Sequence, residues 1–290
     1  MSLVVTGATG HLGRLTVEAL LARGVAPDAI TATGRDATKL AALAELGVQT
    51  AVASFDDPDS LAKAFAGAER VLLVSGNEFG QRVTQHGNAI DAAKAAGVAL
   101  LAYTSAPYAS TTSMLLATEH RATEELILAS GVPYALLRNG WYIENYTGQL
   151  ATTLEHGMVG SAGDGRLSVA ARSDYAEAAA VVLSTDGHEH ATYELGGDIG
   201  VSLADIAGAI AAASGQAVPY IDVTPEAHLQ VLLGAGLPEP MAEVFVDVDR
   251  AIAAGELLVT SGDLARLIGH EATPLSVGIE RDVAAFQAAA

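Results

Sequence analysis

Short, largely uncharged apolar runs alternate with longer segments of helical periodicity through the first half of the chain, and this alternation limits the fold more than any other feature. Such runs are typical of strands buried on both faces, as in a parallel sheet. Each helical segment ends near a glycine that can cap it. The pattern predicts an α/β fold. The predicted strands cover residues 3–6, 29–33, 49–53, 70–74, 99–104 and 133–137, and the predicted helices cover residues 11–23, 37–46, 59–66, 81–96 and 114–130.

The alternation becomes irregular after Arg138, and glycines cluster between residues 157 and 165. We expect a smaller α+β region in this half of the chain. Strands near residues 193–195 and 218–223 are expected to extend the first sheet, so that the second region partly completes it. Further helices are predicted at residues 174–184, 203–214, 226–233, 241–254 and 275–288.

The charge balance argues against one large class of partner. The 290 residues include 34 acidic side chains and 15 Lys and Arg, a formal charge of -19. A surface of this sign repels phosphate backbones, so we expect no nucleic-acid partner. Half of the residues are apolar and none is cysteine, which excludes disorder, disulfides and thiolate metal sites. Because there is no signal-peptide pattern and no long apolar run, we expect a cytoplasmic protein without a membrane span.

A glycine-rich segment follows the first predicted strand and opens the first predicted helix. Glycine lets the backbone turn sharply and approach a pyrophosphate, whose charge the free amides and the helix dipole stabilise. The third glycine allows the helix to pack closely on the strand. We therefore expect a Rossmann-type doubly wound parallel sheet, with residues 1–140 as an NAD(P)-binding domain and residues 141–290 as a substrate-binding region. The candidate phosphate-binding residues are Gly7, Thr9, Gly10, His11, Leu12 and Gly13.

The residues after the second strand usually select the cofactor. A carboxylate there holds the ribose 2'-hydroxyl of NAD, whereas an arginine accommodates the 2'-phosphate of NADP. Here Arg35 stands at that position, and Lys39 lies one helical turn farther on. We expect both to face one phosphate, with Asp36 as the N-cap of the next helix. The sequence thus favours NADPH over NADH. The alternatives are that Arg35 is a solvated loop residue or that Asp36 turns inward.

Several stretches of the chain resemble the NmrA-like atypical short-chain dehydrogenases, and within them the NAD(P)H:quinone oxidoreductases, with triphenylmethane reductases close by. The most specific stretches are residues 136–142, 144–146, 162–165, 172–176 and 267–269. The resemblance implies NADPH bound at the carboxyl edge of the sheet, with NADH as a weaker cofactor, and a small aromatic acceptor such as a quinone or a dye. The residues that it places beside the cofactor are Ser75, Gly76, Tyr103, Thr104, Ser105 and Asn139.

Ordinary short-chain dehydrogenases use a tyrosine four residues before a lysine as their acid, but this chain has Leu116 and His120 at those places. Reduction of a ketone creates a basic alkoxide that needs a positioned acid. Hydride addition to a quinone gives a stabilised anion that water can protonate, and a cationic dye needs no proton. Catalysis then depends on the alignment of the rings. We expect His120 to be a solvated helix residue; the alternative is a proton donor.

The candidate catalytic residues follow the sixth strand, whose end should meet the nicotinamide. Asn139 is predicted to orient the nicotinamide or the acceptor oxygen, and Trp141 and Tyr146 to wall the ring pocket. Tyr142 and Phe79 are further aromatic candidates. The histidines show no metal-ligand spacing, so we expect no metal. A redox sensor that binds NADP(H) without turnover is the main alternative, a nucleotide-sugar epimerase is disfavoured, and a homodimer is compatible with the sequence.

Overall fold

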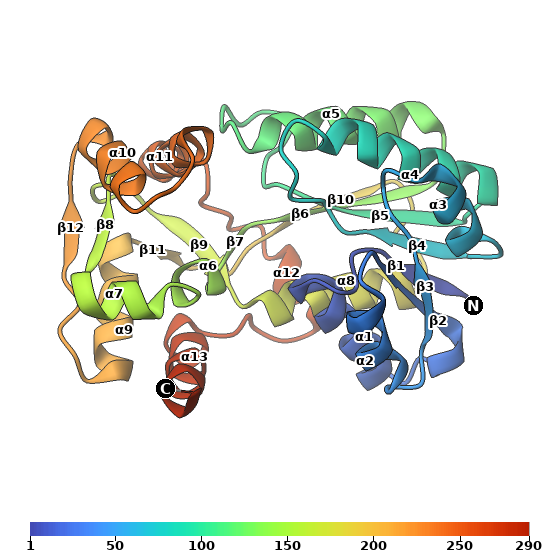
Figure 1. The fold of residues 1–290 in the computed structure, drawn as a ribbon, viewed down its shortest axis with the longest axis horizontal. Coiled ribbons are helices and arrows are strands. Elements are labelled where there is room, and N and C mark those ends of the chain that lie inside the picture. The colour runs from blue at the N-terminus through green and yellow to red at the C-terminus, as the bar shows by residue number, and fades with distance from the viewer. Residues whose placement is uncertain (290) are drawn as a thin grey trace.

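The computed structural model describes residues 1–289, and its largest feature is a seven-stranded parallel sheet (Figure 1). The strand order is β10-β6-β5-β4-β1-β2-β3. The direction of winding therefore reverses between β1 and β4, as in a doubly wound fold. The strands are β1 (Leu3–Val5), β2 (Ile30–Gly34), β3 (Gln49–Val52), β4 (Arg70–Leu73), β5 (Leu100–Ser105), β6 (Tyr134–Asn139) and β10 (Ala191–Leu195).

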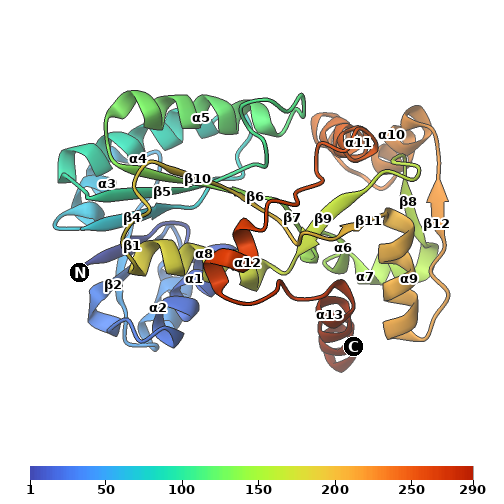
Figure 2. The ribbon, with the colours of Figure 1, turned by 180° about the vertical axis from the view of Figure 1, so that it is seen from behind.

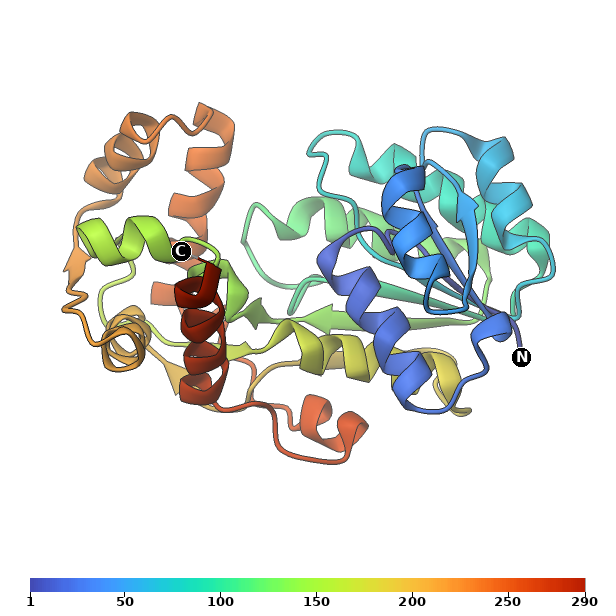
Figure 3. The ribbon, with the colours of Figure 1, turned by 60° about the horizontal axis from the view of Figure 1, so that its bottom comes forward.

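Helices cover both faces of this sheet (Figure 3). One face carries α1 (His11–Ala22), α2 (Ala37–Ala44), α8 (Arg172–Ser184) and α12 (Asp263–Ile268). The other face carries α3 (Pro58–Phe65), α4 (Arg82–Ala96) and α5 (Ala117–Ser130).

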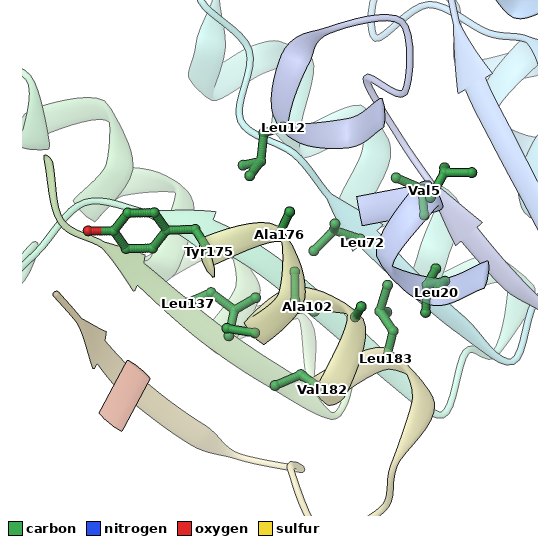
Figure 4. Close-up of a cluster of buried hydrophobic side chains, with 14 of the residues drawn as sticks. Val5, Leu12, Leu20, Leu72, Ala102, Leu137, Tyr175, Ala176, Val182 and Leu183 are labelled. Carbon is green, nitrogen blue, oxygen red and sulfur yellow. The ribbon is translucent and has the colours of Figure 1, made fainter. Parts of the chain in front are cut away.

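Helices α1 and α8 pack against each other on the sheet. Figure 4 shows Leu20 of α1 beside Leu183 of α8, and Ala176 of α8 beside Leu72 of β4. Alanines of α8 are fully buried here, and their small side chains let the two helices lie close to the sheet and to each other. This packing fixes the position of α1, whose first turn borders the site described below.

The second half of the chain builds a second lobe beside the sheet (Figure 2). It contains one sheet of order β11-β9-β7 and another that pairs β12 with β8. Its own core cluster is separate from the two that flank the large sheet. The elements are β7 (Trp141–Tyr142), α6 (Glu144–Thr147), α7 (Leu150–His156), β8 (Met158–Gly160), β9 (Leu167–Ala170), β11 (Gly200–Val201), α9 (Leu203–Ser214), β12 (Tyr220–Asp222), α10 (Pro225–Gly234), α11 (Glu239–Ala253) and α13 (Leu275–Ala289), while the 3-10 turn η1 (Pro27–Ala29) precedes β2.

The predicted fold class is confirmed, and so are the six strands and five helices of the first half. The strand predicted near residues 193–195 is β10, which pairs with β6 in the large sheet. The expectation that residues 218–223 extend that sheet is wrong, because β12 pairs with β8 in the second lobe. The division of roles at residue 140 stays a prediction. In residues 1–289 no helix is long and apolar enough to cross a membrane.

A buried ion network ties β6 and β10 to α5. Arg138 of β6 binds Glu124 of α5 through two hydrogen bonds of 2.7 and 2.9 Å, and its third nitrogen lies 2.8 Å from Glu194 of β10. The side chains of Arg138 and Glu124 expose only 12% and 5% of their surface. Ser105 also donates to Glu124, at 2.6 Å. The network therefore fixes the ends of three neighbouring strands.

We expect Arg138→Ala to lower the free energy of unfolding by about 3 to 5 kcal/mol, because it leaves Glu124 buried without its partner. Urea unfolding followed by circular dichroism measures the change. Arg14→Ala is the matched control, since the Arg14–Glu18 pair is exposed on α1 and such pairs contribute about 0.5 kcal/mol or less. Equal losses in the two variants would show that the network does not hold the strands.

Candidate active site

A cleft of about 570 Å³ lies beyond the carboxyl ends of the strands, at the point between β1 and β4 where the winding reverses. This is the position at which open parallel sheets bind ligands. The cleft extends from the end of β2 past the start of α1 to the segment after β6. Of the predicted site residues, the ones that line it are Gly7, Thr9, Gly10, His11, Leu12, Gly13, Arg35, Lys39, Ser75 and Gly76.

The glycine-rich loop brings backbone amides to this cleft. Gly7 has a φ of +59°, a conformation that favours glycine. A Cβ on Gly13 would lie 2.4 Å from the Gly7 carbonyl oxygen, so only glycine fits there. Gly10 is the N-cap of α1, which has no side-chain cap and no acidic residue in its first turn. The first amides of α1 thus remain available to an anion, and the helix dipole favours negative charge at this point.

At the β2 end of the cleft stand two cations. Arg35 and Lys39 both line it, and the Arg35 side chain is 64% exposed. Asp36 is confirmed as the N-cap of α2, because its carboxylate accepts from the amides of Thr38 and Lys39 at 2.9 and 3.1 Å. Its carboxylate is therefore engaged with the helix rather than with the cleft.

Glu78, in the loop after β4, reaches across to Arg35 and accepts a hydrogen bond of 2.5 Å. Gln85 donates to the second oxygen of the same carboxylate, at 3.0 Å. These two hydrogen bonds and the positive charge of Arg35 lower the pKa of Glu78. An anion bound by Arg35 would meet this carboxylate as a neighbour or displace it.

Buried polar side chains hold the loop that follows β4. The Gly76 amide donates to Nε2 of His86 at 3.0 Å, and the Gly76 carbonyl accepts from Arg82 at 2.8 Å. Burial and the nearby charge of Arg82 lower the pKa of His86 to about 3, so its ring is neutral at pH 7. Since Nε2 accepts, Nδ1 carries the proton, which points to Thr123 at 3.0 Å. The Ser75 amide similarly donates to Thr104 at 2.9 Å.

Tyr103 and Ser105 do not line the cleft. Tyr103 is fully buried, and its hydroxyl lies 2.8 Å from Nδ1 of His120. The expectation that His120 is a solvated helix residue is wrong, because only 6% of it is exposed. Burial, with the nearby charge of Arg82, lowers the pKa of His120 well below the usual histidine value. A neutral, enclosed ring outside the cleft is poorly suited to donate a proton there.

The end of the cleft nearest β6 is formed by Tyr142. Asn139 lies just behind it, and its side-chain amide donates to the Tyr142 hydroxyl at 3.2 Å. Trp141 and Tyr146 instead pack, half-buried, against the core of the second lobe, and neither lines the cleft. The structure therefore brings Asn139 near the cleft through Tyr142, while the two other predicted catalytic residues lie apart from it. Within residues 1–289, no group of three or more His, Asp or Glu side chains could hold a metal ion.

Sequence reasoning left out several residues that line the cleft. Four of them could have been predicted from their position in the chain. Phe55 and Asp56 follow β3, and Asn77 and Glu78 follow β4, and ligands of parallel sheets bind beyond the carboxyl ends of the strands. Gln85 and Tyr142 were harder to predict as lining residues. A glutamine in a helix usually has no functional role, and the sequence does not show which of three neighbouring aromatic residues faces a cleft. The lining residues not predicted as cofactor-binding or catalytic are Thr6, Thr33, Gly34, Ala53, Ser54, Phe55, Asp56, Leu61, Val74, Asn77, Glu78, Gln85 and Tyr142.

The fold and this cleft are those of a dinucleotide-binding protein, and the chain belongs to the NAD(P)H-binding family, whose model matches residues 7–186. It is 42% identical to quinone oxidoreductase 2 of Escherichia coli over 278 residues, which are 96% of this chain and 97% of that protein. The predicted resemblance to NAD(P)H-dependent quinone and dye reductases is thereby confirmed.

Two solved structures agree with this assignment. The crystal structure of the E. coli NADPH-dependent quinone oxidoreductase QOR2 in complex with NADPH matches with a TM-score of 0.91 at 41% identity, covering 96% of this chain and 99% of that one. Triphenylmethane reductase from Citrobacter also matches with a TM-score of 0.91, at 36% identity, covering 98% of this chain and 100% of that one.

The residues of the cleft fit a dinucleotide. Free amides at the start of α1 suit a pyrophosphate, and the glycines leave room for its close approach. Arg35 and Lys39 provide positive charge for a phosphate at one end, and the Tyr142 ring provides an aromatic wall at the other.

We expect Gly10→Val to abolish NADPH binding and to leave the chain folded. A Cβ at Gly10 would meet only the Gly7 carbonyl oxygen, at 3.3 Å, so the loop can keep its shape while the side chain fills the phosphate position. Isothermal titration calorimetry with NADPH measures the loss. The control is Gly208→Val on α9, where the added side chain meets open space. A folded Gly10→Val protein with unchanged NADPH affinity would contradict the assignment of the cleft.

Proposed function

We propose that this protein is an NADPH-dependent oxidoreductase that transfers hydride to quinones or similar small aromatic acceptors, including cationic dyes. The main observation in support is the order of chemical groups along the cleft. It runs from two cations, Arg35 and Lys39, past the free amides of α1 to the aromatic ring of Tyr142. The similarity over almost the whole chain to a quinone oxidoreductase and a triphenylmethane reductase supports it.

The two cations support NADPH over NADH as the preferred cofactor. In this proposal Arg35 and Lys39 hold the 2'-phosphate, and Thr9, Gly10, His11, Leu12 and Gly13 border the pyrophosphate. Ser75, Gly76 and Thr104 border the nicotinamide half, since Ser75 and Gly76 follow β4 and the Ser75 amide donates to Thr104 near the end of β5. Tyr103 and Ser105 support this edge of the sheet from within the core. The bound cofactor supplies the hydride.

The protein's own task is to align the acceptor, because a quinone and a triarylmethane dye are strong electrophiles. Asn139, Trp141 and Tyr146 remain our candidates for shaping the acceptor side of the site, Asn139 through Tyr142 and the two others from the second lobe. We further propose that the enzyme acts in the cytoplasm, on small molecules rather than nucleic acids, and that it forms a homodimer.

We expect Arg35→Ala to weaken NADPH binding by about tenfold or more and to leave NADH affinity nearly unchanged. Hydrogen bonds to charged groups contribute roughly 1.5 to 3 kcal/mol, and 1.4 kcal/mol corresponds to a factor of ten. Fluorescence titration with each cofactor measures the two affinities. Arg14→Ala is the control, since Arg14 is also an exposed arginine but does not line the cleft. Equal losses for NADPH and NADH would show that Arg35 does not read the 2'-phosphate.

The function itself is tested by following NADPH oxidation at 340 nm against a panel of quinones and cationic triarylmethane dyes. We expect turnover with members of both groups, since a quinone and a cationic dye each accept hydride without the Tyr/Lys acid pair that Leu116 and His120 replace. Tight NADPH binding without turnover of any acceptor would contradict the proposal and favour a redox sensor.

A further inference from the structure

Tyr142 is held rigidly at the cleft end nearest β6. Its ring lies edge-to-face on the ring of Tyr175, with centroids 5.0 Å apart. The guanidinium of Arg172 lies over the same ring, 5.0 Å from its centroid. These contacts on two sides leave the phenol with a defined direction, which a group that acts on a bound acceptor requires.

The hydroxyl of Tyr142 has one hydrogen bond, and in it the oxygen is the acceptor. Asn139 donates to it from its side-chain nitrogen at 3.2 Å, and among residues 1–289 no group accepts the hydroxyl hydrogen. Asn139 is itself buried, with an exposed fraction of 6%, and its side-chain oxygen has no hydrogen-bond partner within residues 1–289. A half-buried phenol whose hydrogen is unused, and which borders a cleft, can donate that hydrogen to whatever the cleft holds.

The direction of the cofactor decides what lies beside this hydroxyl. With the 2'-phosphate at Arg35 and the pyrophosphate at the start of α1, the remaining cleft leads to Tyr142. The hydride donor and the acceptor then meet at Tyr142. This step rests on the proposed function.

We propose that the Tyr142 hydroxyl is the catalytic residue that binds the acceptor oxygen and protonates it, with Asn139 as its positioning residue. A quinone gains two electrons and one hydrogen as hydride, and the resulting hydroquinone monoanion takes the proton of the Tyr142 O–H bond. The tyrosinate keeps the hydrogen bond from Asn139 and recovers its proton from solvent. A cationic triarylmethane dye gains the hydride alone and becomes neutral, so it takes no proton from Tyr142.

The groups around the Tyr142 phenol have opposing effects on its pKa. Burial raises the pKa of Tyr142, and the negative charge of Glu144 on α6 does the same, whereas the hydrogen bond from Asn139 and the charge of Arg172 on α8 lower it. Tyr175, also on α8, is the remaining titratable group against the ring, and burial raises its own pKa well above the usual tyrosine value. Tyr142 is thus protonated at neutral pH, as a proton donor must be, while Asn139 and Arg172 stabilise its anion.

Tyr142→Phe separates this role from packing, because the phenyl ring keeps its contacts with Tyr175 and Arg172. We expect the rate of hydride transfer to a quinone to fall about tenfold or more, while the rate with a cationic triarylmethane dye changes less than twofold. NADPH affinity should stay within a factor of two. Tyr134→Phe is the matched control, since Tyr134 lies on β6 outside the cleft and is expected to leave both rates unchanged.

A measurement without turnover tests the same hydrogen bond. Trp141 is the only tryptophan and adjoins Tyr142, so quenching of its fluorescence by duroquinone in the presence of NADP⁺ reports quinone binding. We expect Tyr142→Phe to raise the dissociation constant about threefold to tenfold, the usual range for one lost hydrogen bond.

An unchanged ratio of quinone to dye rates in Tyr142→Phe, whether both are kept or both are lost, would overturn the inference, and so would unchanged duroquinone binding. Failure of the unmodified protein to reduce either acceptor would instead overturn the proposed function. The two failures are therefore distinguishable.

Discussion

The close approach of α1 to the glycine-rich loop is the constraint on which the rest of the site depends. A Cβ at position 13 would lie 2.4 Å from the Gly7 carbonyl oxygen and 2.8 Å from the Ala8 Cα, so any other residue would push the helix away from the strand. Because α1 also packs against α8 and the sheet, its first turn is held over the point where the winding reverses. That contact therefore places the free amides and the positive end of the helix dipole beside the cleft.

The second end of the site depends on a different kind of interaction. Arg138, Glu124 and Glu194 join the ends of β6 and β10 to the middle of α5 through charge-assisted hydrogen bonds. The next residue along β6 is Asn139, whose side chain orients the Tyr142 hydroxyl. A network that contributes to stability thus also fixes the segment at which we place the acceptor. The second lobe begins at this point, which explains how a chain with an ordinary nucleotide-binding sheet acquires an aromatic wall beside it.

Much of the fold could be predicted from the sequence because parallel strands and their helices leave local signals. The apolar runs, the capping glycines and the Asp36 N-cap are all local, and each is found where it was expected. The pairing of β12 with β8 could not be predicted in this way, because the residues of a short strand do not determine which strand it pairs with. The same holds for His120, whose polar neighbours Glu119 and Arg121 suggested a solvated helix face although tertiary packing against Tyr103 buries it.

The site shows the same division. The glycine-rich loop and Arg35 could be predicted to border a ligand site, because the motif itself has a fixed geometry, and both line the cleft. Among Trp141, Tyr142 and Tyr146, however, only three-dimensional packing decides which ring faces the cleft, and the sequence favoured the two that face the core of the second lobe. The hydrogen bond between Glu78 and Arg35, which lie 43 positions apart, could not be predicted from the sequence either.

We propose that one cleft holds the cofactor in a single direction, with its reactive end at Tyr142. A crystal structure of the protein with NADP⁺ tests this most directly. We expect the 2'-phosphate beside Arg35, the pyrophosphate on the amides at the start of α1, and the nicotinamide within van der Waals contact of the Tyr142 side chain. A nicotinamide lying at the Arg35 end, or a cofactor bound away from the glycine-rich loop, would contradict it.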